Sequence, residues 1–580
     1  MIKGIYNILD RHQKNRMAIL LIMILVGAGF ETFGVSAILP LISAVTDPTV
    51  IEINDNYYKI YQFLGLKSPE QFILTMAIVL VFVYIIKNVY LIVLTNAQNH
   101  FVTNNQRRLA TKLVRCYMDQ EYLFHVEHNV AELQRNVEYD IGNFMIVLTN
   151  LLQLITEGLV CFMLVVFLLY TDFFTTILLV ILMSLFMLIY VKGVRKKLRF
   201  LGGETRKYTA AKTKFFLEAF GGIKEVKASG RENYFVNRYD RAAKDFAVAA
   251  QGQMLLTYIP KPTMETLLIC GLLLFMSIRI VLGADTTKFI PVMSVFAVAA
   301  IRMLPSFNRI SGNLNALMFN RLSVNAVSED LQQAKELEKQ SYIAANEVPI
   351  PSADIRCENI TFAYPSNPDK VILKDINLLI PENKSVAFVG PSGAGKTTLA
   401  DIILGVLRPD AGNVCIGAID IYNNLGEWHK SVGYIPQAIF LTDDTIRANV
   451  AFGIPEGEID DDQVWRALEE AQIADFVRSQ KDDIYSMIGD RGVKISGGQR
   501  QRIGIARALY SNPRYIVLDE ATSALDSETE KAVMDAIYRF SGKKTMIIIA
   551  HRLTTISHCD IIYEVSDGKV NRRRYDDIIK

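Results

Sequence analysis

The sequence lacks three features that would point to common classes of protein. It has only six cysteines in 580 residues, and none forms a CxxC pair or another spacing typical of metal ligands. Its formal net charge is only +2, so the composition does not indicate nucleic-acid binding. No convincing cleavage site follows its first apolar segment, which is too long for the core of a signal peptide. We therefore expect buried, reduced thiols, no nucleic-acid partner and a retained N-terminal span.

What the sequence does have is apolar residues, which make up 51% of the chain. They are concentrated in long blocks up to about residue 320, whereas the chain beyond about residue 350 resembles a soluble protein. The length exceeds that of one compact domain. We therefore predict a transmembrane domain over 1–325, a linker over 326–352 and a soluble domain over 353–580. Six apolar stretches are long enough to cross a membrane as helices, namely 17–45, 72–96, 144–170, 173–192, 255–283 and 289–319.

Loop charges predict how these helices are oriented. The connections 97–143 and 193–253 are rich in lysine and arginine, whereas the connections on the opposite side are poor in both. Basic loops stay in the cytoplasm, so we expect both termini and both long loops there. The long loops have helical spacing of apolar residues, which indicates spans that extend into the cytoplasm and turn near 120–130 and 220–233. Separate helical hairpins on the membrane surface are the alternative.

The loop over 46–71 is expected on the outer side. It contains a tyrosine-rich amphipathic stretch, and tyrosine favours the headgroup zone of a bilayer. Two interpretations remain open, which are a short helix lying on the outer leaflet and an ordinary packed loop.

A phosphate-binding loop begins the soluble half. The stretch "VAFVGPSGAGKTTLA" predicts a strand over Val386–Val389, a glycine-rich loop and then a helix, which is the context that such a loop requires. Glycines let backbone N–H groups point at phosphate oxygens. Lys396 would reach the β- and γ-phosphates, and the Thr397 hydroxyl would bind Mg²⁺. The candidate nucleotide-binding residues of this loop are Gly390, Ser392, Gly393, Gly395, Lys396, Thr397 and Thr398.

Two further motifs lie downstream. In "YIVLDEATSALD", an apolar strand over Tyr515–Leu518 ends in Asp519 and Glu520. A carboxylate at such a strand end suits the shell of Mg²⁺, and the next carboxylate suits activation of water. In "ISGGQRQRIGIARAL", a helix begins after a glycine pair, and its N-terminal amides suit an anion. The candidate residues of this second motif are Ser496, Gly498 and Gln499.

Taken in order, the motifs of the soluble half resemble those of the ATP-binding-cassette ATPase domain over roughly 353–572. They are Tyr364, "GPSGAGKTT", Gln437 in "GYIPQ", "ISGGQ", "VLDEATSALD" and His551 in "IIAHR". This resemblance implies ATP and Mg²⁺ as cofactors. It implies that Tyr364 stacks on adenine and that Gln437 senses the γ-phosphate and Mg²⁺. It also implies that Asp519 positions Mg²⁺, Glu520 is the general base and His551 holds the γ-phosphate.

One cassette preceded by six spans is similar to a half-transporter of the exporter branch. The fold class that follows is an all-α membrane domain with long cytoplasmic extensions, fused to an α/β P-loop ATPase domain. In this family ATP lies between two cassettes, so the resemblance implies a dimer. Since the candidate base Glu520, His551 and the "ISGGQ" segment are all present in this chain, a homodimer is favoured over a heterodimer with one degenerate site.

Basic residues within the apolar blocks suggest where cargo binds. Intramembrane charges usually face a water-filled cavity or a partner charge, and the fork of arginine suits phosphate oxygens. The candidate substrate-binding residues are Lys87, Lys261, Arg302 and Arg309. Pairing with Glu31, Glu157 or Glu265 is the structural alternative, and snorkelling to the membrane surface is another for Lys261 and Arg309.

The motif "RMLPSFNRI" and a basic residue after a proline on span 5 are similar to bacterial flippases for lipid-linked oligosaccharides. That resemblance implies an ATP-driven flippase of a polyprenyl-pyrophosphate-linked oligosaccharide in a bacterial inner membrane. The alternatives are an exporter of another lipid, a drug or a peptide and, in a different class, an ATP-gated channel or regulator. The lysines at positions 87 and 261 cannot form the bidentate hydrogen bonds with a pyrophosphate that an arginine forms.

Overall fold

A computed structural model describes residues 10–36, 41, 44–45, 55–63, 65, 68–171, 173–281, 286–341, 348–489, 492–519, 534, 537–550 and 556–579. Side chains over 286–302 and 334–341, and at some other positions, lie outside this description. The chain forms two compact units. The first comprises Met1–Gln120 and His125–Glu338, and the second comprises Glu121–Phe124 and Lys339–Lys580. The break near residue 338 falls inside the predicted linker, while the predicted domain limits themselves stay predictions.

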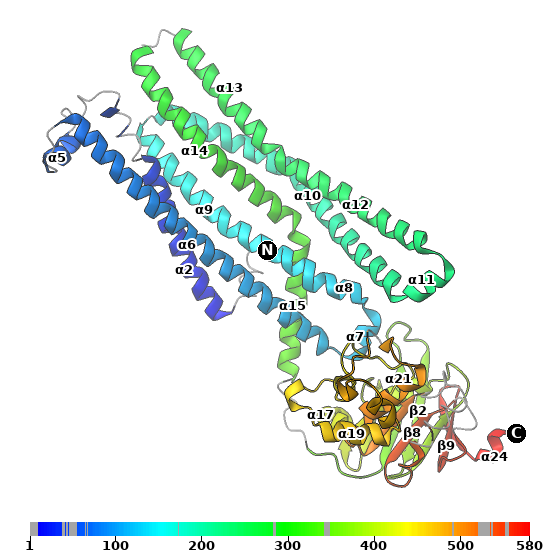
Figure 1. The fold of residues 1–580 in the computed structure, drawn as a ribbon. Helices are drawn as coiled ribbons and strands as arrows, with labels where there is room; N and C mark the ends of the chain where they lie inside the picture. Colours follow the sequence, from blue (N-terminus) through cyan, green and yellow to red (C-terminus); the bar gives the residue numbers. More distant parts are fainter. Residues whose placement is uncertain are drawn as a thin grey trace. The chain divides into compact units, whose positions relative to one another are not determined.

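The first unit is helical. Its long helices are α2 (Arg11–Ser36), α6 (Pro69–Met118), α9 (Ile141–Thr171), α10 (Phe173–Gly221), α12 (Glu232–Tyr258), α13 (Pro260–Val281), α14 (Thr286–Phe319) and α15 (Arg321–Ser341). Figure 1 shows α10 and α12 side by side, joined at one end through the short helix α11 (Ile223–Ser229). Among the described residues, three segments are long and apolar enough to cross a membrane, namely Arg11–Gly34, Pro69–Met118 and Val130–Leu169.

The predicted extension of the spans into longer helices is confirmed, and their cytoplasmic location stays a prediction. Helix α6 runs unbroken for 50 residues and α10 for 49, far beyond the roughly 20 residues that cross a bilayer. Helix α6 begins where Ser68 caps the Gln71 N–H, with Pro69 at the first helical position. Helix α11 ends at Gly230, which adopts a left-handed conformation with φ of 63°. Both turns of the chain therefore lie where the sequence predicts them.

The turn between α6 and α9 is more broken than the turn between α10 and α12. Between α6 and α9 the chain forms α7 (Tyr122–Glu127), α8 (Val130–Arg135) and a single π-helical turn, η1 (Asn136–Asp140), which leads directly into α9. A π-turn inserts one extra residue into the helical ladder and often marks a functional position.

The tyrosine-rich loop between α2 and α6 contains helix α5 (Asp55–Phe63). Tyr57 and Tyr61 on α5 pack against Phe72 at the start of α6, and the rings of Tyr61 and Phe72 meet edge to face at 5.9 Å. Tyr58 is exposed. The segment therefore forms a short helix with one face packed on the protein, and its location on the outer leaflet stays a prediction.

The second unit is an α/β domain with two sheets. An antiparallel sheet has the order β2 (Val371–Ile380), β1 (Ile355–Ala363), β4 (Ala411–Ile416) and β5 (Ile419–Asp420). A six-stranded sheet has the order β10 (Lys569–Arg573), β9 (Ile561–Ser566), β3 (Ser385–Val389), β8 (Thr545–Ile549), β7 (Tyr515–Asp519) and β6 (Val432–Ile435). Every strand pair of the second sheet is parallel except β9–β10.

The cores of this unit follow from its strand sequences. Strands β3, β7 and β8 are buried at every position, as continuous apolar strands of a parallel sheet covered on both faces should be. Helix α16 (Lys396–Ile403) packs on this sheet, and α21 (Gly497–Leu509) contributes to the same cluster of buried residues as β7. The strands predicted at 386–389 and 515–518 are thus confirmed.

Candidate ATP-binding and transport sites

Parallel topology brings the candidate ATP-site residues to one edge of the six-stranded sheet. The phosphate loop follows β3, Asp519 is the last residue of β7, and Gln437 comes two residues after β6. These strands run parallel, so their carboxyl ends lie on the same side, where ligands of such sheets bind. Glu520 and His551 lie outside the described residues, although Glu520 follows the end of β7 directly and His551 follows β8 and Ala550.

The phosphate loop requires glycine at its first position. Gly390 has φ of 140°, and a Cβ atom there would lie 2.1 Å from the carbonyl oxygen of Val565 on β9. Gly395, with φ of 100°, caps the start of α16 in the left-handed conformation. The loop thus ends at a helix N-terminus, where unpaired backbone N–H groups favour an anion. These residues fit a nucleotide phosphate.

Lys396 lies across this loop. Its side chain is 4% exposed, and its ammonium donates hydrogen bonds to the carbonyl oxygens of Gly390 (2.9 Å) and Pro391 (3.0 Å). The neighbouring Thr397 is exposed, whereas Thr398 is buried. The exposure of Thr397 is compatible with its predicted metal role, and the nucleotide-binding role of the buried Thr398 stays a prediction.

Tyr364 lies beside the phosphate-loop helix. Its hydroxyl is 3.2 Å from the Oγ1 of Thr398, and its ring meets Phe362 edge to face at 5.0 Å. These contacts fix a half-buried aromatic ring next to α16. The position suits the stacking role that the resemblance implies, and the role itself stays a prediction.

The far end of α16 is closed by three side chains from one downstream segment. The Tyr422 hydroxyl donates to Ile402 O (2.7 Å), and Trp428 Nε1 donates to Ile403 O (3.0 Å). His429 Nε2 lies 3.0 Å from Leu404 O. Terminal carbonyl groups of a helix have no partner within it, so these contacts satisfy groups that burial would otherwise penalise. Sequence motifs gave no indication of this cap.

A second carboxylate near Asp519 also escaped prediction. Asp519 is 8% exposed, and Asp401 lies on α16 one turn after Thr397. Burial, with the charge of Asp519, raises the pKa of Asp401 to about 6 from its usual 3.8. Burial likewise raises the pKa of Tyr434 on β6, with contributions from Asp519 and Asp401. Asp401 and Tyr434 therefore share the electrostatic surroundings of Asp519.

The signature segment begins a capped helix. Ser496 accepts a hydrogen bond from the Gln499 N–H, and the Gln499 side chain accepts one from the Ser496 N–H at 2.8 Å. Ser496 is exposed and Gly498 is half-buried, so the helix N-terminus is accessible. The accessible N-terminus of α21 is compatible with the anion that the sequence motif predicts there.

The three arginines of α21 lie against neighbouring segments of the chain. All three are half-buried and donate to backbone carbonyl groups of neighbouring segments. Arg507 bonds Asn449 O (2.8 Å) and Phe440 O (2.7 Å), and its guanidinium lies over the ring of Phe452. Burial lowers the pKa of Arg507 to about 10. Arg500 and Arg502 bond Gly492 O and Gln472 O, so these side chains brace the helix.

Comparison with known proteins decides the family. Residues 373–523 match the profile described as "ABC transporter", and residues 12–282 match the one described as "ABC transporter transmembrane region". The chain is 30% identical over 454 residues to an "ATP-dependent lipid A-core flippase" of Cupriavidus metallidurans, covering 77% of this chain and 75% of the relative. The chain belongs to the ABC transporter family.

Two other comparisons agree. An "ATP-dependent lipid A-core flippase" of Ralstonia nicotianae is 29% identical over 473 residues, which cover 80% of this chain and 78% of that protein. Among solved structures, a bacterial Atm1-family ABC exporter with ATP bound has a TM-score of 0.74 at 22% identity and covers 98% of this chain and 97% of that one. The ABC transporter is thus a membrane protein with an exporter fold and an ATP-binding ATPase domain, and it acts as an ATP-driven translocase.

In the membrane unit of this ABC transporter, two of the four candidate substrate-binding cations are paired. Lys87 on α6 lies 2.8 Å from the Glu31 carboxylate on α2, with only 5% of its side chain exposed. Arg309 on α14 contacts both carboxylate oxygens of Glu157 on α9, at 2.5 Å through Nε and 3.2 Å through Nη2. Pairing, which the sequence left open as an alternative, is therefore present at both positions.

The two pairs differ in exposure. Arg309 keeps 56% of its side-chain surface exposed, while Glu157 is 12% exposed. Glu157 thus acts as a buried support that orients an accessible guanidinium. Lys261 and Glu265 on α13 are exposed, and the side chain of Arg302 lies outside the described part of α14. Described residues include no group of three or more His, Cys, Asp and Glu side chains arranged to hold a metal ion.

Proposed function

We propose that this ABC exporter is a homodimeric flippase for a lipid that carries an oligosaccharide on phosphate. A polyprenyl-pyrophosphate-linked oligosaccharide is the first candidate substrate. The observation that supports the proposal is the Arg309–Glu157 pair, because it holds an exposed, oriented guanidinium within the helical unit. A guanidinium has five donors and Glu157 uses two of them, so the others can meet a phosphate. Lys87 is buried and paired with Glu31, so we expect it to contribute less to binding of the substrate phosphate.

The second candidate substrate is a lipid A core, which the printed names of the two flippase relatives favour. Both candidates share a saccharide, a phosphate and a lipid. They differ in the lipid and in how phosphate is attached. The same exposed arginine would meet the phosphate of either.

In the ATPase domain, bound ATP with Mg²⁺ supplies the free energy that drives transport. Lys396 and the N–H groups at the start of α16 would bind phosphate oxygens, and Thr397 and Asp519 would hold Mg²⁺. Gln437 would complete the metal shell. Glu520 would take a proton from the attacking water, and His551 would hold the γ-phosphate. Ser496, Gly498 and Gln499 would meet the nucleotide of the second copy.

We place the protein in a bacterial inner membrane with both termini in the cytoplasm. Support comes from the basic stretches 97–143 and 193–253, which would stay inside. The helices that carry these stretches extend beyond the length needed to cross a bilayer, so the charges lie outside its apolar core.

The test compares three lipids in proteoliposomes. We would measure ATP-dependent flipping of a labelled polyprenyl-pyrophosphate oligosaccharide, a lipid A core and phosphatidylglycerol, which has phosphate but no saccharide. Flipping of the first alone supports the first candidate, and flipping of the second alone supports the second. Flipping of neither saccharide lipid contradicts the proposal, and ATP-dependent currents would identify a channel.

Arg309→Ala and Arg302→Ala then test the phosphate contact. One charge-assisted hydrogen bond is worth about 1.5–3 kcal/mol, so each loss should weaken headgroup affinity roughly ten- to a hundred-fold. Basal ATP hydrolysis should survive. The matched control is Arg107→Ala, because Arg107 is an exposed arginine of α6 outside the apolar blocks. Normal flipping in the double variant would show that neither arginine binds substrate.

A further inference from the structure

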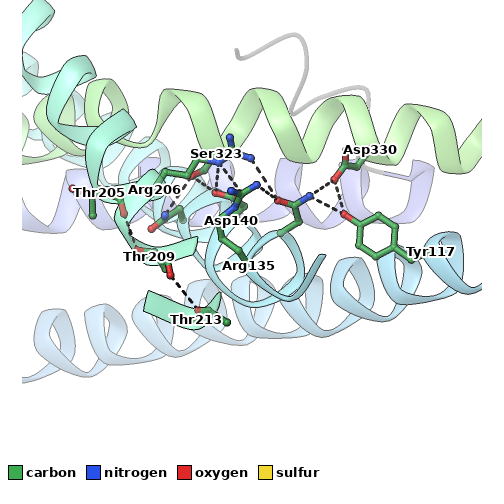
Figure 2. A network of polar contacts seen from close by, with 11 residues as sticks. Tyr117, Arg135, Asp140, Thr205, Arg206, Thr209, Thr213, Ser323 and Asp330 are labelled. Carbon is green, nitrogen blue, oxygen red and sulfur yellow. Dashed lines mark hydrogen bonds and ion pairs between the residues drawn. The ribbon is translucent and has the colours of Figure 1, made fainter. Parts of the chain in front are cut away.

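A polar network of buried and half-buried side chains joins five helical segments of the first unit. We call it the stalk network, and it consists of Tyr117 on α6, Arg135 on α8, Asn136 and Asp140 on η1, Arg206 on α10, and Ser323 and Asp330 on α15. Figure 2 shows its bonds running without interruption from Tyr117 to Arg206. Nothing in the ATP site or the proposed substrate site uses these residues.

One end of the stalk network centres on Asp140, which is 0% exposed. Arg206 Nε lies 2.9 and 3.2 Å from the two carboxylate oxygens, and the Ser323 hydroxyl donates to Oδ1 at 2.6 Å. Arg135 Nε forms an ion pair with Oδ2 at 3.5 Å. A fully buried carboxylate needs such partners, because an unpaired charge in this environment is strongly disfavoured.

The other end centres on Asp330, seven residues after Ser323 on the same helix. Its carboxylate accepts bonds from the Tyr117 hydroxyl at 2.7 Å and from the Asn136 amide at 3.1 Å. The amide oxygen of Asn136 in turn accepts a bond from Arg135 at 2.9 Å. Asn136 therefore links the two carboxylates, and the network holds two arginines against two acids.

The π-turn explains how the two ends share one surface. Asn136 and Asp140 are the first and last residues of η1, whose extra residue per turn shifts the direction of the side chains relative to an α-helix. On α15, a separation of seven residues is about two turns, so Ser323 and Asp330 face the same side. Helix α15 is thereby fastened at two points to η1, and through η1 and Tyr117 to α10 and α6.

Helix α15 occupies a particular place in the chain. It is the last helix before the ATPase domain, because the first unit ends at Glu338 and the second resumes at Lys339. Because the chain passes from α15 into the ATPase domain, we expect a shift of that domain on ATP binding to displace α15. A helix fastened at two points to a charge-balanced buried network moves together with its neighbours, since packed interiors transmit strain.

We propose that the stalk network is the joint that transmits the movement of α15 to α6 and α10, and that Asp140 is its positioning residue. Without the joint, ATP hydrolysis should continue, but α6 and α10 should no longer respond to it. This inference does not depend on the substrate, so it stands or falls separately from the proposed flippase activity.

The experiment uses full-length protein in vesicles of bacterial lipid and needs no transport substrate. Hydrogen exchange of the α6 and α10 segments is measured with and without ATP, Mg²⁺ and vanadate, alongside basal ATP hydrolysis. The variants are Asp140→Asn, which keeps shape and removes charge, and the double variant Tyr117→Phe with Ser323→Ala, which removes one bond at each end. The control is Ser328→Ala, because Ser328 lies on α15 but bonds only the Val324 carbonyl of its own helix.

In the wild type and the control, nucleotide and vanadate should change exchange in α6, α10 and α15 together. In both network variants we expect ATP hydrolysis within about twofold of the wild type and at least a threefold smaller change in α6 and α10. Asp140→Glu, which restores the charge, should recover part of the response.

A wild-type response of α6 and α10 in both variants would overturn the proposal. So would a parallel loss of ATP hydrolysis and vanadate trapping, because the network would then be needed only for folding. If Asp140→Asn does not give folded protein, the double variant decides the matter by the same criteria.

Discussion

Two buried lysines show how differently the two units hold a positive charge. Lys87 and Lys396 are each 4% exposed. Lys396 in the ATPase domain bonds two backbone carbonyl oxygens of its own loop, which orient the ammonium. Lys87 in the membrane unit is paired with the Glu31 carboxylate of another helix, which neutralises it. Backbone carbonyl oxygens therefore orient one buried ammonium, and a carboxylate of another helix pairs with the other.

Arginines follow the same division. Arg507 on the signature helix is held by carbonyl groups of Asn449 and Phe440, whereas Arg309 in the membrane unit is held by the Glu157 carboxylate. A carbonyl bond comes from the local path of the backbone. A carboxylate pair requires a second charged residue on another helix. Backbone carbonyl groups thus hold Arg507, and a carboxylate of another helix holds Arg309, although the ATPase domain also contains ion pairs such as Arg447–Asp461.

The largest expected effect tests the ATPase side of this comparison. Glu520→Gln should preserve ATP and Mg²⁺ binding but remove the general base, so ATP turnover should fall by about 10²–10⁴-fold and an ATP-bound dimer should accumulate. Turnover and nucleotide retention are measured on purified protein. Glu458→Gln serves as the control, since Glu458 is exposed on the same unit. Turnover near the wild-type level would exclude Glu520 as the base.

An intermediate effect tests the membrane side. Lys87→Met should strand Glu31, and because Glu31 is 28% exposed the cost should lie near the lower limit for a broken buried pair, about 3 kcal/mol. Adding Glu31→Gln should recover most of the loss. Thermal unfolding in detergent reports both values, with exposed Lys59→Met as control. If the single and double variants were equally stable, Lys87 would not depend on its partner.

The smallest effect concerns Asp401 near the predicted metal site. The pKa of this carboxyl is raised to about 6, so in the folded state ionised Asp401 is disfavoured. The wild type therefore loses stability as pH rises from about 4 to 6, and Asp401→Asn should remove that loss. Without Mg²⁺ the variant should be more stable by about 1 kcal/mol above pH 6, after allowance for solvent screening, and equal to the wild type below pH 4.

Thermal melting at pH 4 and pH 7.5 measures this difference. A gain of that size corresponds to a rise in Tm of roughly 2–4 °C. An advantage of Asp401→Asn that is the same at both pH values would show that ionisation of Asp401 is not its cause.

Sequence alone predicted the parts of the ATPase domain that depend on local pattern. The strand over 386–389, the loop after it, the strand over 515–518 and the capped helix after Ser496 all follow from short motifs with fixed spacing. The long helices were predictable for a related reason, because apolar periodicity and scarce glycine and proline act locally. What was missed near the ATP site is non-local, since Trp428 and His429 cap α16 only after the chain has returned to it.

The membrane unit was less predictable at the level of partners. Glu157 was one of three possible partners for the cations, and spacing could not choose among them because helix packing decides which residues meet. The stalk network was missed for the same reason. Its members span Tyr117 to Asp330, and the π-turn that aligns Asn136 with Asp140 has no signature in the pattern of apolar residues.

The strand order of the six-stranded sheet has a consequence for synthesis of the protein. Strand β3, which carries the phosphate loop, lies between β8 and β9, whose first residues are Thr545 and Ile561. At roughly 5–20 residues per second, both neighbours leave the ribosome about ten to thirty seconds after β3. During that interval an apolar strand has both edges open, and such edges attract other chains. Nascent chains that stop before Thr545 should therefore depend on chaperones and be degraded rapidly, although they contain the complete phosphate loop.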